Sequence, residues 1–435
     1  MTATTGTLRH LTLLGRFRTQ QMRQQFAAMT VFLMRGTAAV LSYVMFALIG
    51  RRCSAAEYGV FALVFALTGF FGPVAAAAQD SIAYRYIPAS RHQVREIARF
   101  NLRFLLFGIP IACLAGILLL RSSLGPTALS VAPLLAGSIA VSGLNEYLFA
   151  VERASGPVLG AIFAKELLWR LVFIALIVAS LYFDAPRLSS KTVASLYLFS
   201  LLPSLLAFLC SFAAQLRSSP SSSAPEEVAP FRVRPSQVGS FFGITCLNMA
   251  SVHLDTLILG LAHGAELAAF FSAQRSTQIL NFFSYSFGVV AAPAISLAYA
   301  RGDITAIERR SRQAAIVAGG CVLVFAGLMM AAAPEVMAIF NPSFRADGYL
   351  LRILCIAPIL STFCGLHSWI PVLCGLEKEY LLGRCLLAGV FTLPKIVAAA
   401  CGDITVFAAL VVGEQAAVAV MGATLCAWKG RIRVV

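Results

Sequence analysis

Twelve stretches of roughly 20 to 30 mostly apolar residues, separated by short polar segments, run through the 435-residue chain. A helix needs about 20 such residues to cross the hydrocarbon core of a bilayer. Few folds are open to such a chain, because backbone exposed to lipid must satisfy its hydrogen bonds internally. We therefore predict an all-α, polytopic membrane protein with twelve transmembrane helices. The expected spans are 26–50, 59–80, 103–120, 128–150, 156–183, 192–215, 236–261, 266–298, 314–340, 349–375, 380–401 and 403–428.

Composition excludes the other broad classes of protein. Hydrophobic residues make up 59% of the chain and charged residues only 12%, against about 25% charged residues in an ordinary soluble domain. A disordered chain has the opposite balance, with few aliphatic and many charged residues. Lys and Arg (34) outnumber Asp and Glu (19), for a net charge of +15. In a soluble protein this excess would suggest a nucleic-acid partner, but here the topology has to explain it.

The positive residues are unevenly divided between the two sides of the expected membrane. The side of the N-terminus carries 22 of them and the opposite side seven. Cytoplasmic loops are enriched in Lys and Arg, so we predict a multi-pass membrane protein with both termini in the cytoplasm. The remaining five basic residues lie inside the expected spans: Arg35, Lys165, Arg170, Arg275 and Lys395.

A Ser- and Pro-rich segment around residues 217–237 divides the spans into six and six, as a linker would. Residues 49–61 and 259–270 resemble each other, and both lie at the first turn of their half. An even number of spans per half gives both halves one orientation, so we predict parallel repeats forming two six-helix lobes around a central cavity. The predicted regions are an amphipathic cytoplasmic tail (1–25), an N-lobe (26–215), a linker (216–235), a C-lobe (236–428) and a basic cytoplasmic tail (429–435).

Motifs for chemical catalysis are missing from the sequence. The eleven cysteines form no C-x-x-C pair or Cys/His cluster, so neither a metal site nor a disulfide framework is expected. No P-loop, H-E-x-x-H or G-x-S-x-G sequence is present. We therefore predict that the protein is not an enzyme, has no catalytic residues and needs no cofactor beyond a possible coupling ion, a proton or sodium.

Several stretches in both halves carry a family resemblance. The first, residues 47–59, contains Glu57-Tyr58-Gly59. The others are residues 254–260, 266–275, 292–296, 298–303, 340–344 and 351–358. In order and spacing the chain resembles the Wzx-type polysaccharide repeat-unit flippases. These belong to the superfamily that includes the lipid II flippase and the multidrug/toxin extruders. The chain departs from the pattern at Ala268, where many members have Gly.

The resemblance implies a MATE-like fold, a place in the bacterial inner membrane and a function. It implies alternating access that flips an undecaprenyl-pyrophosphate-linked oligosaccharide for O-antigen, capsule or exopolysaccharide assembly. The expected partners are this lipid-linked oligosaccharide and membrane lipid. A polysaccharide polymerase and a chain-length regulator are further candidate partners. No nucleic-acid partner is expected. Two alternatives stay open: a proton- or sodium-coupled extruder of small molecules or drugs, and a non-transporting scaffold of a polysaccharide synthase complex.

The basic residues within the spans are the candidate substrate site. A charge at the bilayer centre costs about 2.5–3.5 kcal/mol on insertion scales, so such residues usually face the protein interior or water. Arg35 lies about nine residues, or roughly 14 Å, into the first span, and Arg275 lies at a similar depth in the eighth. We expect these two, one from each half, to hold the pyrophosphate, since Arg gives bidentate hydrogen bonds to phosphate. The alternative for Arg275 is an ion pair with Asp255.

The other three basic residues would support that site. Glu166 and Arg170 have the i, i+4 spacing of an intrahelical pair. At 3.6 residues per turn, Lys165 points about 100° away from Glu166 and would be free. Lys395 follows Pro394, where a kink is expected. Once paired charges cancel, the interior is predicted to be mildly cationic.

Two polar stripes on neighbouring spans predict a water-lined cavity. One consists of Gln274, Gln278 and Asn281, and the other contains Asn248, Ser251 and Asp255. If transport is coupled to a proton or sodium ion, the candidate acids within the spans are Asp255, Glu414 and Glu146.

Overall fold

The computed structural model describes residues 29–77, 79, 82–83, 87, 94–155, 158–180, 187–218, 235–262, 264–429 and 432. This part of the chain contains helices and no strand, as the sequence predicts. The expected tail (1–25) lies outside the described residues, as do most of the linker and most of the C-terminal tail. The predicted domain boundaries therefore stay predictions.

The first half of the chain forms one helical bundle, which begins with a helix at Met29–Arg52. Its other helices are α2 (Ala55–Ala75), α4 (Val94–Leu124), α5 (Ala132–Ser155), α6 (Val158–Ile162), α7 (Trp169–Ser180) and α8 (Ser190–Ser218). A 3-10 turn, η2 (Gly125–Ser130), precedes α5, and a π-helical segment, η3 (Phe163–Leu168), joins α6 to α7.

The second half forms the other bundle. Its longer helices are α9 (Pro235–Ala262), α10 (Gly264–Ala300), α11 (Ile304–Ala331), α13 (Gly348–Phe363), α15 (Glu377–Ala400) and α16 (Ile404–Trp428). Its short elements are α12 (Ala333–Phe340), η5 (Pro342–Asp347) and α14 (Ile370–Leu373). Ten helices within the described residues are long and apolar enough to cross a membrane. Residues 158–180 and α10 add two further long helical stretches, in agreement with the twelve helices expected.

Helix ends differ from the predicted spans where a helix leaves the bilayer or breaks. The helix α11 begins at Ile304, ten residues before the expected span, because hydropathy detects the apolar part of a helix and misses a polar end. The expected span 349–375 is a helix only to Phe363. Gly365 follows with φ +65°, a left-handed conformation that favours glycine and ends a helix.

A short sequence pattern explains the start of α2. Ser54 caps α2 by accepting a hydrogen bond from the backbone N–H of Glu57, which is the geometry of an S-x-x-E capping box. The Glu57 carboxylate also accepts a hydrogen bond from the backbone N–H of Ser190, at the start of α8. Glu57 of the first motif therefore has a structural role: it joins the N-termini of α2 and α8.

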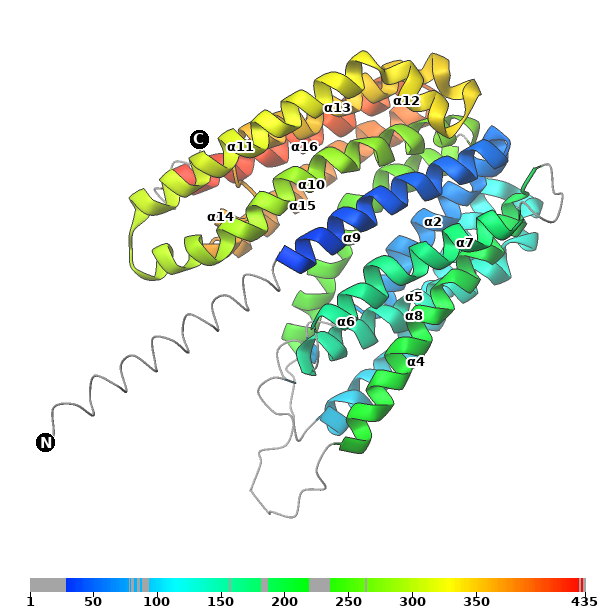
Figure 1. Ribbon diagram of the computed structural model, residues 1–435, viewed down its shortest axis with the longest axis horizontal. Helices are drawn as coiled ribbons and strands as arrows, with labels where there is room; N and C mark the ends of the chain where they lie inside the picture. The colour runs from blue at the N-terminus through cyan, green and yellow to red at the C-terminus, as the bar shows by residue number, and fades with distance from the viewer. Residues whose placement is uncertain are drawn as a thin grey trace, which may run out of the picture.

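The two bundles meet along helices that begin each half. The helix α2 packs against both α9 and α10, and α9 also packs on α15. Figure 1 shows the bundles converging near α12 and separating toward the opposite end, where α6 and α14 lie. We call the converging end the Asn341 end.

Hydrogen bonds to main-chain atoms join the bundles at the Asn341 end. The Asn341 side-chain amide donates to the carbonyl oxygens of Gly50 (2.9 Å) and Cys53 (3.3 Å). Arg51 Nε donates to the carbonyl oxygen of Ile339 at 2.8 Å. A Cβ at Gly50 would lie 2.7 Å from the carbonyl oxygen of Phe340, so this close approach requires glycine. Two of the motif stretches, 47–59 and 340–344, therefore form one inter-bundle contact.

Candidate functional site

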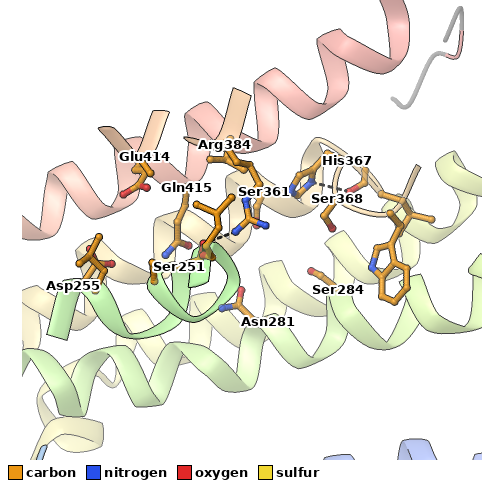
Figure 2. Close-up of a pocket in the computed structure, with 18 residues that line it drawn as sticks. Ser251, Asp255, Asn281, Ser284, Ser361, His367, Ser368, Arg384, Glu414 and Gln415 are labelled. Atoms are coloured by element: carbon orange, nitrogen blue, oxygen red, sulfur yellow. Dashed lines mark hydrogen bonds between the residues drawn. The ribbon is translucent and has the colours of Figure 1, made fainter. Parts of the chain in front are cut away.

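A cavity of about 290 Å³ lies within the second bundle. The helices α9, α10, α13, α15 and α16 and the segment that links α13 to α14 contribute its walls. Ten of its eighteen lining residues are polar, and Figure 2 labels these ten. The expected cavity was central, between the lobes, whereas this one is inside the C-terminal half.

One end of the cavity is formed by two carboxylates that share a lysine. Lys395 Nζ lies 2.6 Å from Asp255 Oδ1 and also donates to Glu414 Oε2. The three residues come from α15, α9 and α16, and the Lys395 side chain is only 2% exposed. Asp255 and Glu414 lie at one end of the view in Figure 2. Because two carboxylates already hold the ammonium, an anionic substrate would have to compete with both for Lys395.

Arg275 has an aromatic environment between the bundles. Its guanidinium carbon lies 5.4 Å from the ring centre of Phe46, 5.0 Å from that of Phe65 and 4.6 Å from that of Phe271. Nη1 donates to Gln278 Oε1 at 2.9 Å, whereas Nε and Nη2 are buried without a hydrogen-bond partner among the described residues. Cation–π contacts stabilise a guanidinium, but they leave its other donors unsatisfied.

The alternative of an Arg275–Asp255 ion pair is wrong. Asp255 pairs with Lys395, and no carboxylate within the described part of the chain lies within ion-pair distance of Arg275. The sequence alone allowed an Arg275–Asp255 pair. In the structure, α15 places Lys395 beside Asp255, and Asp255 pairs with Lys395 instead.

Arg35 and Arg275 lie at different levels. Phe46, which contacts Arg275, follows Arg35 by eleven residues, or about 16 Å of helix. Phe32 and Gly36 flank Arg35, and they pack against Phe282 of α10, with a Phe32–Phe282 ring-centre distance of 5.3 Å. The half-buried Arg35 is therefore at the same interface between the bundles, but displaced along it.

The expectation that Lys165 is free is wrong. Lys165 Nζ lies 2.5 Å from Glu146 Oε2 and 4.2 Å from the ring centre of Phe149. Lys165 belongs to η3 and Glu146 to α5, so the pair joins two helices and the spacing of residues along one helix could not reveal it. Glu146, a candidate coupling acid, is therefore engaged in an ion pair.

The predicted Glu166–Arg170 pair is confirmed, with Nη1 and Oε2 3.3 Å apart. Arg170 also donates from Nε to Ser42 Oγ of the first helix at 2.7 Å. Its guanidinium lies 4.5 Å from the ring centre of Trp169. These contacts hold Arg170 inside the first bundle.

The side chains of the two predicted polar stripes lie in different surroundings. Ser251, Asp255 and Asn281 line the cavity. Gln274 accepts a hydrogen bond from Thr256, and Gln278 accepts one from Arg275. Part of each predicted stripe therefore lines this cavity.

Sequence reasoning missed Arg384, which was counted among the 22 basic residues on the cytoplasmic side because it lies near the start of the expected span 380–401. Arg384 lines the middle of the cavity and donates to Asn248 Oδ1 at 3.3 Å and to Ser251 Oγ. The sequence does indicate that Arg384 faces the protein interior, because it precedes Lys395 by eleven residues, which puts both on one helical face. Asn248, predicted as a cavity residue, contacts this arginine.

Comparisons with solved structures identify the fold. No family model and no curated protein matches the chain. An inward-facing multidrug-resistance MATE family transporter of the MOP superfamily superposes with a TM-score of 0.71 at 17% identity, covering 93% of this chain and 97% of the other. An outward-facing transporter of the same description gives 0.61 at 18% identity, covering 94% and 95%.

A third neighbour has a different pocket. This MOP superfamily transporter from Pyrococcus furiosus, described as having a binding pocket of reverse polarity, gives a TM-score of 0.62 at 19% identity and covers 94% of this chain and 95% of its own. Identities this low establish the fold alone. The chain is therefore a multi-pass membrane protein with a MATE-like fold.

Proposed function

We propose that this protein is an alternating-access transporter that flips an undecaprenyl-pyrophosphate-linked oligosaccharide across the bacterial inner membrane. The products would serve O-antigen, capsule or exopolysaccharide assembly. The observation that carries the proposal is Arg275, a buried guanidinium between the bundles that has no carboxylate partner among the described residues. A buried charge without a partner is costly, so a ligand that completes it would gain strongly from binding.

Arg275 fits a site that opens when the bundles move. Phe46 and Phe65, two of the three rings around it, belong to the first bundle, whereas Arg275 and Phe271 belong to α10 of the second. Separation of the bundles would remove the first two rings and uncover Nε and Nη2. A pyrophosphate accepts two parallel hydrogen bonds from such a guanidinium.

The arrangement of the bundles suits an inward-facing state. The contacts of Asn341 and Arg51 join the bundles at one end, and Figure 1 shows them separating toward the other. The distribution of Lys and Arg assigns the Asn341 end to the side away from the cytoplasm. The inward-facing MATE structure also superposes better than the outward-facing one. A substrate made in the cytoplasm would enter the gap between the bundles in this state, and it would reach Arg275 once the bundles separate around that residue.

Flipping by purified protein in liposomes tests the proposal. The substrate is an undecaprenyl pyrophosphate that carries a short fluorescent oligosaccharide, and its exposure in each leaflet is read by quenching. Arg275→Ala should lower the flipping rate at least tenfold, and Arg275→Lys should keep part of the rate, because lysine retains the charge and loses the fork of donors.

The control is Arg345→Ala, which removes an exposed ion pair with Glu335 and should flip at the wild-type rate. Equal incorporation of all variants into the liposomes is checked by gel. Wild-type flipping by Arg275→Ala would contradict the proposal.

A second candidate is an ion-coupled extruder of small molecules, favoured by the Asp255–Lys395–Glu414 group. Two carboxylates that share one ammonium have a net negative charge, to which a proton or sodium ion can bind. In this case, transport of a small solute should depend on pH or sodium, and Glu414→Gln should remove that dependence while the lipid-linked substrate is not flipped.

A further inference from the structure

We propose that the cavity in the second bundle is a saccharide subsite in which Arg384 binds the carboxylate of an acidic sugar. The inference rests on the proposed function, because it concerns the oligosaccharide of the flipped lipid. It assigns a role to an arginine outside the pyrophosphate site and predicts one chemical feature of the sugar.

The first support is the state of Arg384. Its guanidinium contacts the neutral side chains of Asn248 and Ser251, and no carboxylate in the described part of the chain lies within ion-pair distance. The side chain is half-buried and lines the cavity. Among the described residues it is the only Lys or Arg that lines this cavity, and a guanidinium favours a carboxylate through parallel hydrogen bonds.

The second support is the uneven charge of the cavity. Asp255 and Glu414 share Lys395 at one end, which leaves an excess of one negative charge there. Arg384 lies eleven residues from Lys395 along α15, or about 16 Å. An acidic ligand would therefore be attracted to Arg384 and repelled from the other end, so the cavity would bind it in one orientation.

The third support is the lining. Ten of the eighteen lining residues are polar. Six of these ten carry a hydroxyl or amide group, including Ser284, Ser361 and Gln415. Such groups both donate and accept hydrogen bonds, as sugar hydroxyls require.

The fourth support is Trp369, which lines the cavity beside this polar surface. Its indole lies against α10 at Gly288, where a Cβ would come within 2.2 Å of Nε1. An amphipathic aromatic ring of this kind has an apolar face for the C–H face of a sugar. The volume of about 290 Å³ is near the lower limit of small-molecule sites, about 300–1,000 Å³, which suits one sugar unit.

Binding of defined sugars to the purified full-length protein tests the inference. The probes are methyl glucuronide, methyl glucoside and inorganic phosphate, and binding is measured by ligand-observed NMR. We expect the wild type to bind the glucuronide at least tenfold more tightly than the glucoside. Arg384→Gln should remove this preference, whereas Arg384→Lys should keep part of it. The control Arg345→Gln should leave it unchanged, since Arg345 lies at the Asn341 end, outside the cavity.

Two outcomes would overturn the inference. One is equal affinity of the wild type for glucuronide and glucoside, which would mean that the cavity does not select a carboxylate. The other is that inorganic phosphate binds the cavity as tightly as the glucuronide does, which would mean that Arg384 binds anions without selecting a sugar. The flipping assay and the binding assay test different claims. Normal flipping by Arg275→Ala contradicts only the proposed function, and a lack of preference for glucuronide contradicts only the saccharide subsite.

Discussion

The two bundles differ in how their internal charges are paired. In the first, each lysine or arginine of the fifth span has one carboxylate: Lys165 pairs with Glu146, and Arg170 pairs with Glu166. In the second, Lys395 is shared by two carboxylates, and Arg275 and Arg384 have none among the described residues. Charge is balanced locally in the fifth span of the first bundle and left unbalanced around Lys395, Arg275 and Arg384 in the second.

This difference suggests a division of labour. Paired charges satisfy one another in a fixed arrangement, which suits a scaffold. Unbalanced charges are costly inside a membrane protein, and they are stabilised only by a ligand, by aromatic rings or by a change of conformation. The cavity lies beside the unbalanced group. The second bundle is therefore where we expect ligand chemistry, and the contacts between the bundles are where we expect conformational control.

The largest effect is expected at Lys395. Lys395→Met would leave Asp255 and Glu414 facing each other without a cation, at a cost of about 3–5 kcal/mol for a broken buried ion pair. We expect a marked fall in the thermal unfolding temperature of the protein in detergent. The triple variant Lys395→Met, Asp255→Asn, Glu414→Gln should recover most of the loss, because no charge stays unpaired. An unchanged unfolding temperature in the single variant would mean that the carboxylates are not buried together.

A smaller effect is expected at Gly50, where the bundles touch. Gly50→Ala would place a Cβ 2.7 Å from the Phe340 carbonyl oxygen, and overpacking of this kind costs about 1–3 kcal/mol. The contact at the Asn341 end should loosen. Cys53, which lies in that contact, is buried, and burial raises the pKa of its thiol to about 12.

Labelling of Cys53 by a maleimide reports on this loosening. In a background where Cys53 is the only cysteine, labelling should be slow, because the thiol is inaccessible and little thiolate is present. Gly50→Ala should increase the rate, whereas Gly327→Ala, at a helical position with open space around it, should not. An equal rate in both variants would show that Gly50 does not hold the bundles together.

Much of the fold could be predicted from the sequence, because it depends on local patterns. Apolar length predicts the helices, and the capping sequence at Ser54 predicts the start of α2. Short-range charge pairing was also predictable, as for Glu166 and Arg170, since the spacing of one helix brings them together.

Partners from different helices could not be predicted. Lys395 contacts Asp255 across 140 residues of sequence, and only the packing of α9, α15 and α16 brings them together. Lys165 was expected to be free because its partner Glu146 comes from α5, a different helix. Arg384 was assigned to the cytoplasm because hydropathy places it near the end of a span, although its helical face is that of Lys395.

The smallest effect is expected at Lys165. Its side chain is 27% exposed and that of Glu146 is 25% exposed, so water can solvate Glu146 when the lysine is lost. Lys165→Met should cost about 1 kcal/mol or less, as for partly exposed ion pairs, and the unfolding temperature should fall by far less than in Lys395→Met. The same measurement in the same detergent compares the two lysines directly. A loss as large as that of Lys395→Met would mean that the first bundle also depends on a buried, unscreened charge, and the contrast between the bundles would then fail.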